Sequence, residues 1–175
     1  NADVEFGYFA DTVIGDTPNA IRVFSQTTDI STFELVSGAF PTKSNEVALA
    51  STMADQYKIG DTIRLTESGS NTLLKEHEFT ITGFVNSSEL LSKTTKGVSS
   101  AGSGDLSGFA VVPQDAFDSE VYTIARLRYP DLRKWKTTSR EYADKVTELQ
   151  QALEEKLADN GTARLDTLKT MADDK

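Results

Sequence analysis

Hydrophobic and polar positions alternate with a period of two over most of the first 130 residues, which predicts a series of short β-strands. The alternation is clearest at 78–85 (EFTITGFV), where Phe79, Ile81 and Val85 fall on one face. Turn-forming residues separate the segments, as in Gly-Asp-Thr-Pro-Asn at 15–19. Further strands are predicted at 4–10, 20–24, 33–36, 46–50, 62–66, 109–112 and 122–129.

From Ser139 the hydrophobic period lengthens and predicts an amphipathic helix over 139–157, with Thr138 and Glu141 forming a capping box. After Asn160-Gly161 a helical spacing resumes, so the helix either breaks there or tolerates the glycine at a cost of ~1 kcal/mol. A short helix at 51–58 and a helical turn at 115–118 are also predicted. The apolar positions of the long helix are Tyr142, Val146, Leu149, Leu153 and Leu157.

Residues 86–108 follow neither period. They are rich in serine and glycine, and we predict a long, mobile loop there. Long loops in compact domains are uncommon and are usually either functional or disordered.

Composition narrows the classes of protein. The chain has 175 residues, with 18 basic and 27 acidic side chains and a net charge of −9, which argues against nucleic-acid binding. It has no cysteine, so disulfides, zinc–thiolate sites and cysteine nucleophiles are excluded. No apolar run approaches the ~20 residues that a membrane-spanning helix needs. Because neither an initiator methionine nor a signal peptide opens the sequence, we expect a fragment or a processed product.

Catalytic motifs have little support, and we expect no catalytic, cofactor-binding or metal-binding residues. There is no Gly-x-Ser-x-Gly elbow, Ser-x-x-Lys motif or Gly-Lys-Ser/Thr phosphate loop. The glycine-rich stretch 102–108 lacks the third glycine of a dinucleotide-binding loop. His77 is the one histidine, and a flank of an exposed hairpin explains it more simply than a catalytic triad does.

A basic run at 126–140 interrupts the acidic chain, with Asp131 as its one acidic residue. One interpretation is a solvated connection between a strand and the helix. The other is a surface that faces anionic lipid head groups or a cell-wall polymer, where each base is worth ~1 kcal/mol near an anionic membrane. The candidate interaction surface comprises Arg128, Arg133, Lys134, Trp135 and Lys136.

The order of the predicted elements resembles the extracytoplasmic core domain of MacB/FtsX-type ABC transporter permeases, in particular those of streptococci and related Gram-positive bacteria. The resemblance covers residues 4–157. It rests on six segments in sequence: 36–41 (VSGAFP), 45–49 (NEVAL), 58–65 (KIGDTIRL), 79–85 (FTITGFV), 109–113 (FAVVP) and 122–127 (YTIARL).

The resemblance implies an α+β fold, with a small β-rich subdomain at 33–112 inserted in a porter-like α/β subdomain that both ends of the chain build. Residues 1–136 would form the core domain, with the flexible loop 86–108. Residues 137–175 would form a long helical segment leading toward a coiled coil or the membrane. The first transmembrane helix and the first porter helix of the family are missing from this sequence.

The implied function is that of a non-catalytic extracellular domain of a cell-membrane permease. It would couple ATP hydrolysis by a separate cytoplasmic ABC ATPase subunit to extracellular substrate handling or to regulation of a partner. Candidate partners include a second permease copy and an extracellular protein or cell-wall component. One alternative is a secreted or cell-wall-associated module that binds a ligand through loop 86–108, and another is a hydrolase with a site at His77.

Overall fold

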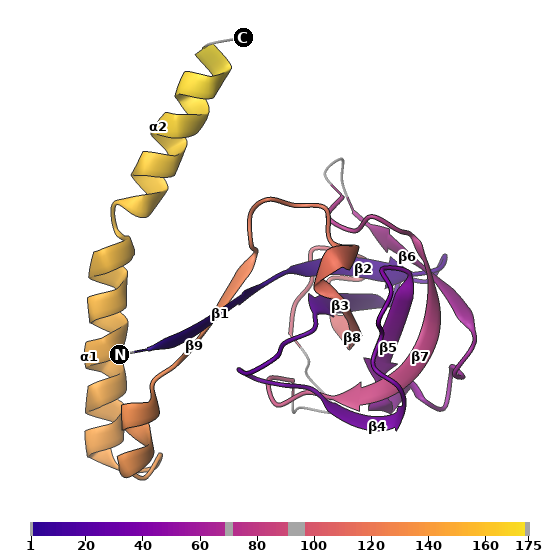
Figure 1. Ribbon diagram of the computed structural model, residues 1–175, viewed down its shortest axis with the longest axis horizontal. Coiled ribbons are helices and arrows are strands. Elements are labelled where there is room, and N and C mark those ends of the chain that lie inside the picture. The colour runs from indigo at the N-terminus through magenta and orange to yellow at the C-terminus, as the bar shows by residue number, and fades with distance from the viewer. Residues whose placement is uncertain (1, 69–71, 91–96, 174–175) are drawn as a thin grey trace. The chain divides into compact units, whose positions relative to one another are not determined.

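The computed structural model describes residues 2–68, 72–90 and 97–173, and the chain divides into two compact units (Figure 1). Residues 3–128 form the first unit, and residues 1–2 with 129–175 form the second. Among the described residues the first unit is mostly β. Its strands are β1 (Asp3–Gly7), β2 (Phe9–Ile14), β3 (Ala20–Ser25), β4 (Glu34–Gly38), β5 (Glu46–Ala50), β6 (Thr62–Glu67), β7 (Glu78–Asn86), β8 (Leu106–Val112) and β9 (Ile124–Arg128).

Six of these strands close into a barrel in the order β7-β5-β8-β3-β2-β6, and β6 pairs again with β7. Strands β3 and β8 run parallel, as do β5 and β7, and the remaining pairs are antiparallel. Closure depends on the length of β7. Its first residues pair with β6, where Phe79 lies opposite Ile63, and its last residues pair with the additional strand β4.

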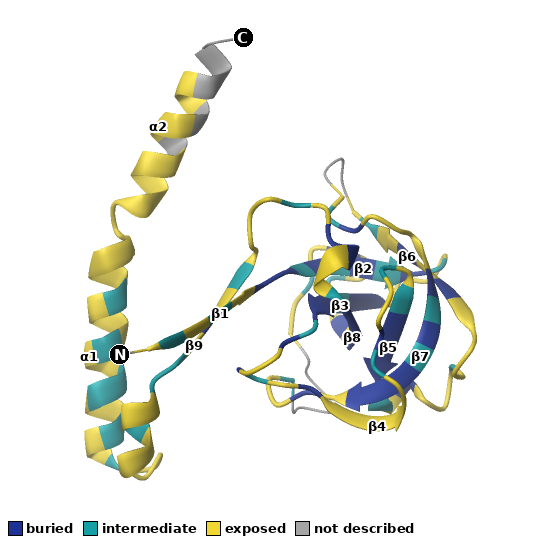
Figure 2. Cartoon of the chain, in the orientation of Figure 1, coloured by how far each residue is buried: buried dark blue, intermediate teal, exposed yellow. Residues whose placement is uncertain are grey.

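The alternation in the sequence explains how the barrel acquires its core (Figure 2). Alternate residues of β2 and β6 are buried, and β3, β5 and β8 are buried along almost their whole length. Burying a large apolar side chain contributes roughly 1.5–3 kcal/mol, so these strands account for much of the favourable free energy of folding. The largest fully buried apolar side chains are Phe79, Ile21, Leu49, Leu65 and Ile81.

Glycine is required where β4 pairs with β7, at Gly38 and Gly83. Gly38 has a φ of +77°, and a Cβ there would lie 2.3 Å from the carbonyl oxygen of Thr82. On the facing strand, a Cβ on Gly83 would lie 2.5 Å from the carbonyl oxygen of Ala39. The two backbones therefore approach more closely than any side chain would allow.

Strands β1 and β9 form a separate two-stranded antiparallel ribbon, in which Asp3 lies opposite Arg128 and Glu5 opposite Arg126. The chain therefore enters and leaves the barrel through adjacent strands. The side chains of Val4 and Phe6 are 48% and 54% exposed, whereas Arg126 is only 5% exposed. The ribbon thus turns its charged face toward the barrel and leaves its apolar face open.

The second unit contains the 3₁₀ helix η3 (Pro130–Lys134) and the helices α1 (Arg140–Leu157) and α2 (Asn160–Asp173). Ser139 caps α1, and its Oγ accepts a hydrogen bond from the backbone N–H of Tyr142. No residue of α1 is buried. None of the described helices is both long enough and apolar enough to cross a membrane.

The prediction of a porter-like α/β subdomain is wrong. Residues 9–14 and 20–25, which that prediction assigned to the α/β part, are β2 and β3 of the closed barrel. Within the described part of residues 3–128 the helical elements are the three-residue 3₁₀ turns η1 (Ser51–Met53) and η2 (Gln114–Ala116). A sheet that closes on itself buries its own inner face, so the barrel needs no covering layer of helices.

Several local predictions are confirmed and others are corrected. The helix over 139–157, the turn near 115 and most of the strands are confirmed. The predicted strand at 4–10 is two strands, because the chain leaves the ribbon for the barrel at Tyr8. The predicted helix at 51–58 is the single turn η1, which suffices to bury Met53. The capping residue of α1 is Ser139 rather than Thr138, and α1 ends before Asn160-Gly161, at Leu157.

Candidate functional site

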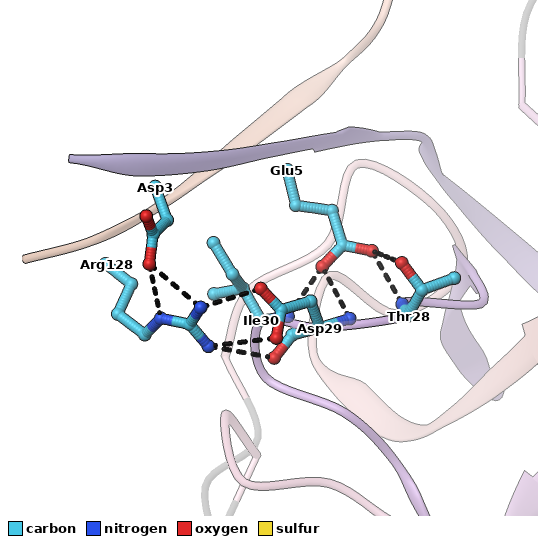
Figure 3. Close-up of polar contacts among 6 residues, drawn as sticks. All are labelled: Asp3, Glu5, Thr28, Asp29, Ile30 and Arg128. Carbon is cyan, nitrogen blue, oxygen red and sulfur yellow. Dashed lines mark hydrogen bonds and ion pairs between the residues drawn. The ribbon is translucent and has the colours of Figure 1, made fainter. Parts of the chain in front are cut away.

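Arg128 holds three segments of the first unit together (Figure 3). Its guanidinium donates through Nε and Nη2 to Asp3 Oδ2 on β1, at 3.0 and 2.8 Å. It also donates through Nη1 and Nη2 to the two carboxylate oxygens of Asp29, at 3.1 and 2.7 Å. The hydrogen bonds that Arg128 donates to Asp29 and Asp3 raise its pKa. Arg128 therefore ties β9 both to β1 and to the loop that follows β3.

Glu5 holds the same loop from the neighbouring position of β1. Its carboxylate accepts hydrogen bonds from the backbone N–H groups of Thr28, Asp29 and Ile30 and from the hydroxyl of Thr28. Partial burial raises the pKa of Glu5, but these hydrogen bonds outweigh that effect and leave the pKa below its ordinary value. We call Asp3, Glu5, Asp29 and Arg128 the ribbon clamp.

Arg126 extends this attachment into the interior. Its Nε and Nη2 donate to the carboxylate of Glu89 at 2.6 and 3.1 Å, and its guanidinium lies 5.5 Å from the centre of the Phe24 ring. Its Nη1 is buried without a hydrogen-bond partner among the described residues. The same guanidinium lies beside Gly7, where a Cβ would be 3.5 Å from Nη1. A barrel strand, the ribbon and the segment after β7 therefore meet at one buried cation.

This arrangement joins segments of the first unit by charge-assisted hydrogen bonds. Glu5 bonds to the loop after β3, and Arg128 bonds to Asp29 of the same loop. Bidentate Arg–carboxylate pairs also fix the orientation of the groups they join. A force applied to the ribbon would therefore reach the barrel through several directional bonds. No group of three or more His, Asp or Glu side chains that could hold a metal ion occurs in the described ranges.

The structure separates the basic run at 126–140 into two sets. Arg126 and Arg128 lie on β9 and are paired with carboxylates of the first unit. The other predicted surface residues lie in the second unit, and we call them the basic turn: Arg133, Lys134, Trp135 and Lys136. Arg128 is thus a part of the ribbon clamp, whereas the other four residues remain a candidate interaction surface.

The basic turn has a regular local structure. Tyr129 accepts a backbone hydrogen bond from Leu132, Leu132 accepts one from Trp135, and Lys136 accepts one from Ser139. The ammonium group of Lys134 lies 4.3 Å from the centre of the Trp135 ring. Arg133, Lys134 and Lys136 are exposed and Trp135 is partly exposed. The turn therefore presents three exposed cations, one of which lies against the indole.

The predicted loop 86–108 is described at 86–90 and from 97 on: Asn86 ends β7, residues 106–108 belong to β8, and the segment from 97 is held by the barrel. Arg22 forms a bidentate pair with Asp11 and also donates to the carbonyl oxygen of Val98. The backbone N–H of Ser100 donates to Asp11, and Ala101 is 2% exposed. Burial raises the pKa of Asp11, but Arg22 outweighs it and the pKa is lowered. Residues 91–96 of the predicted loop lie outside the described residues.

His77 lies in the exposed turn before β7, and its backbone carbonyl accepts a hydrogen bond from Leu65. Sequence reasoning missed the acidic partners in the ribbon, although a signal was present. Asp3 and Glu5 alternate on one strand as Arg126 and Arg128 do on another. Opposite charges with a period of two favour an antiparallel pair with these side chains on one face.

No family model, no curated protein and no solved structure matches this chain.

Proposed function

We propose that this chain is the extracellular domain of an ABC transporter permease that resembles the MacB/FtsX type. It has no catalytic role, and it couples ATP hydrolysis by a separate cytoplasmic subunit to events outside the cell, either substrate handling or regulation of a partner. The order of the six sequence segments supports this function. The absence of a porter-like subdomain removes the fold as an argument for it, so the remaining support comes from how the barrel is attached.

The observation that carries the proposal is the attachment of the barrel to the ribbon. The strands by which the chain enters and leaves the barrel are paired along five residues each. The ribbon clamp then bonds this pair to the loop after β3 at Arg128 and Glu5. A single flexible strand would bend when the ends of the domain are displaced. A hydrogen-bonded ribbon bends less and therefore transmits the displacement to the barrel.

The chain also contains a rod-like element suited to a transmission role. Helix α1 has 18 residues, and two residues separate it from α2. Backbone hydrogen bonds hold such a helix as one body, while a loop of the same length would bend.

A localisation and coupling experiment tests the proposal. The protein is expressed from its own gene in its own host, and intact cells are treated with an external protease. We expect the protease to cleave the domain on intact cells, the remainder to stay in washed membranes, and the protein to copurify with an ABC ATPase in detergent. Recovery of the domain in the culture medium, or its protection inside the cell, would contradict the proposal.

A matched pair of variants then tests the role of the ribbon clamp. Arg128→Ala removes the bonds to Asp3 and Asp29, whereas Arg64→Ala removes an exposed arginine of β6. In a strain lacking the gene, we expect Arg64→Ala to restore the transporter-dependent phenotype. We expect Arg128→Ala to copurify with the ATPase and yet fail to restore it. Full restoration by both variants would refute transmission through the clamp.

A ligand-binding module that uses loop 86–108 is the second candidate. One observation favours it, which is that the described part of the loop is anchored at Asp11 and Arg22 while Val98 is 78% exposed. An anchored loop with an exposed apolar side chain costs less entropy on binding than a loose loop does. Recovery of the domain in the medium would select this candidate.

A further inference from the structure

Several cations without an ion pair lie close together in the described segment 130–140. Its net charge is −9, and the arginines of β9 are neutralised by Glu89, Asp3 and Asp29. Among the described residues, Arg133, Lys134, Lys136 and the nearby Arg140 form no ion pair. Asp131 is the one carboxylate within residues 130–140. The net charge of this short segment is therefore 4 − 1 = +3 in an otherwise acidic protein.

The basic turn is held in place by its own backbone hydrogen bonds. Residues 130–139 form the helix η3 and a further hydrogen-bonded turn before α1 begins, so the cations belong to an ordered structure. Trp135 follows η3 directly and lies against the ammonium group of Lys134. Such a turn presents charge and an apolar ring together. Because its backbone is already ordered, binding loses little conformational entropy there.

We propose that the basic turn binds the surface of an anionic phospholipid membrane. Its cations would meet the phosphate groups, and Trp135 would lie at the boundary between head groups and acyl chains, where amphipathic aromatic rings are enriched. An anionic wall polymer would satisfy the cations but would provide no apolar layer for the indole. The aromatic ring among the cations is therefore the feature that favours lipid over polymer.

The expected strength follows from the number of cations. A lysine or arginine near an anionic membrane contributes about 1 kcal/mol, which is about fivefold in affinity at 1.4 kcal/mol per tenfold. Reversing the charge of two lysines removes two attractive contributions and adds repulsion. We expect at least about a 25-fold loss in the partition coefficient.

The only tryptophan of the chain reports directly on this contact. The full chain is titrated with vesicles of phosphatidylglycerol and, separately, of phosphatidylcholine. We expect the Trp135 emission to shift to shorter wavelength with the first lipid alone, and added salt to reverse the shift because the attraction is screened. Sedimentation with vesicles measures the bound fraction independently.

A charge-matched pair of variants distinguishes the basic turn from the overall charge of the protein. The double variant Lys134→Glu/Lys136→Glu should lose binding by the factor given above. The control Lys58→Glu/Lys75→Glu changes the net charge equally at exposed positions of the barrel unit and should bind as the unmodified chain does. Trp135→Phe, followed by sedimentation, should keep most of the affinity because its cations are unchanged.

Three results would overturn the inference: no emission shift with phosphatidylglycerol, equal loss of binding in both double variants, or binding to purified cell wall without binding to vesicles. Each would leave the proposed function standing, because protease accessibility and copurification with an ATPase decide that proposal. Conversely, failure of those two assays would not affect lipid binding by the basic turn, which the vesicle titration decides.

Discussion

At the scale of single residues, the attachment of the ribbon depends on charges that face inward. Arg126 is 5% exposed and is compensated by one carboxylate, that of Glu89. Removing one partner of a buried pair leaves an uncompensated charge, which costs more than the pair contributes. Nη1 of Arg126 has no hydrogen-bond partner within the described ranges, which adds to the free-energy cost of burying this guanidinium. The attachment of β9 is therefore sensitive to the residues around this guanidinium.

Glu5 gives a prediction with a defined pH dependence. Its pKa is lowered in the folded state, so its contribution is complete above the ordinary value of 4.5 and is lost as the pH falls through the folded value. Glu5→Gln keeps the size of the side chain. It removes the negative charge and replaces one of the two accepting oxygens with an NH₂ group. We expect a loss of about 1–2 kcal/mol in the free energy of unfolding at pH 7.

Urea unfolding of the unmodified chain and of Glu5→Gln at several pH values measures this difference. It should shrink steadily below pH 4.5, because the unmodified carboxyl group then becomes protonated too. Glu76→Gln, at an exposed position before β7, is the control and should change the stability little at any pH. A difference for Glu5→Gln that stays constant down to strong acid would contradict the role given to the carboxylate.

At the scale of elements, the close pairing of β4 with β7 leads to a second prediction. Gly83→Ala would place a methyl group 2.5 Å from the carbonyl oxygen of Ala39, and backbone cannot move aside as a flexible side chain can. We expect a destabilisation of about 1–3 kcal/mol. Gly161→Ala is the matched control, since nothing lies within 4 Å of the added carbon and alanine favours α2 by about 1 kcal/mol.

Thermal unfolding followed by circular dichroism compares the two glycine variants. The expected signs are opposite: Gly83→Ala lowers the melting temperature of the strand signal, and Gly161→Ala raises the helical signal. If Gly83→Ala were neutral, β4 would have to be bound to β7 more loosely than the register from Gly38 to Glu34 indicates.

The same scale shows what the sequence could predict. Strands such as β5 and β7 and the helix α1 were predictable because their periodicity lies within one short segment. The closure of the barrel was not, since it depends on β6 meeting both β2 and β7 in a register that no local pattern encodes. The partners of Arg128 were missed because they are 125 and 99 residues away, although the alternating charges of β1 and β9 favour the pairing of these strands. The residues of the basic turn are consecutive and so are visible in the sequence, and their role as an interaction surface stays a prediction.

At the scale of the whole molecule, the first unit has what an independent domain needs. Its main core cluster runs from Tyr8 to Phe117, and both ends of its chain are fixed by the ribbon. A domain with its own core and paired ends folds without the segment that follows it. In the second unit no residue of α1 is buried, so α1 gains little from packing. The free energy of unfolding should therefore reside in the barrel.

Truncating the chain after Leu132 tests whether the free energy of unfolding resides in the barrel. The cut lies four residues beyond Arg128, so the new terminal carboxylate is not directly beside the ribbon clamp. We expect the shortened chain to unfold in one cooperative transition with a melting temperature within about 4 °C of the full chain, because a change below 1 kcal/mol shifts a domain of this size by no more than that. The helical part of the far-ultraviolet signal should disappear, and the strand signal should stay. A larger fall in the melting temperature would mean that residues beyond 132 stabilise the barrel. Arg128→Ala, introduced into the truncated chain, then measures how much the ribbon clamp contributes to the stability of the barrel, because α1 and α2 are no longer present.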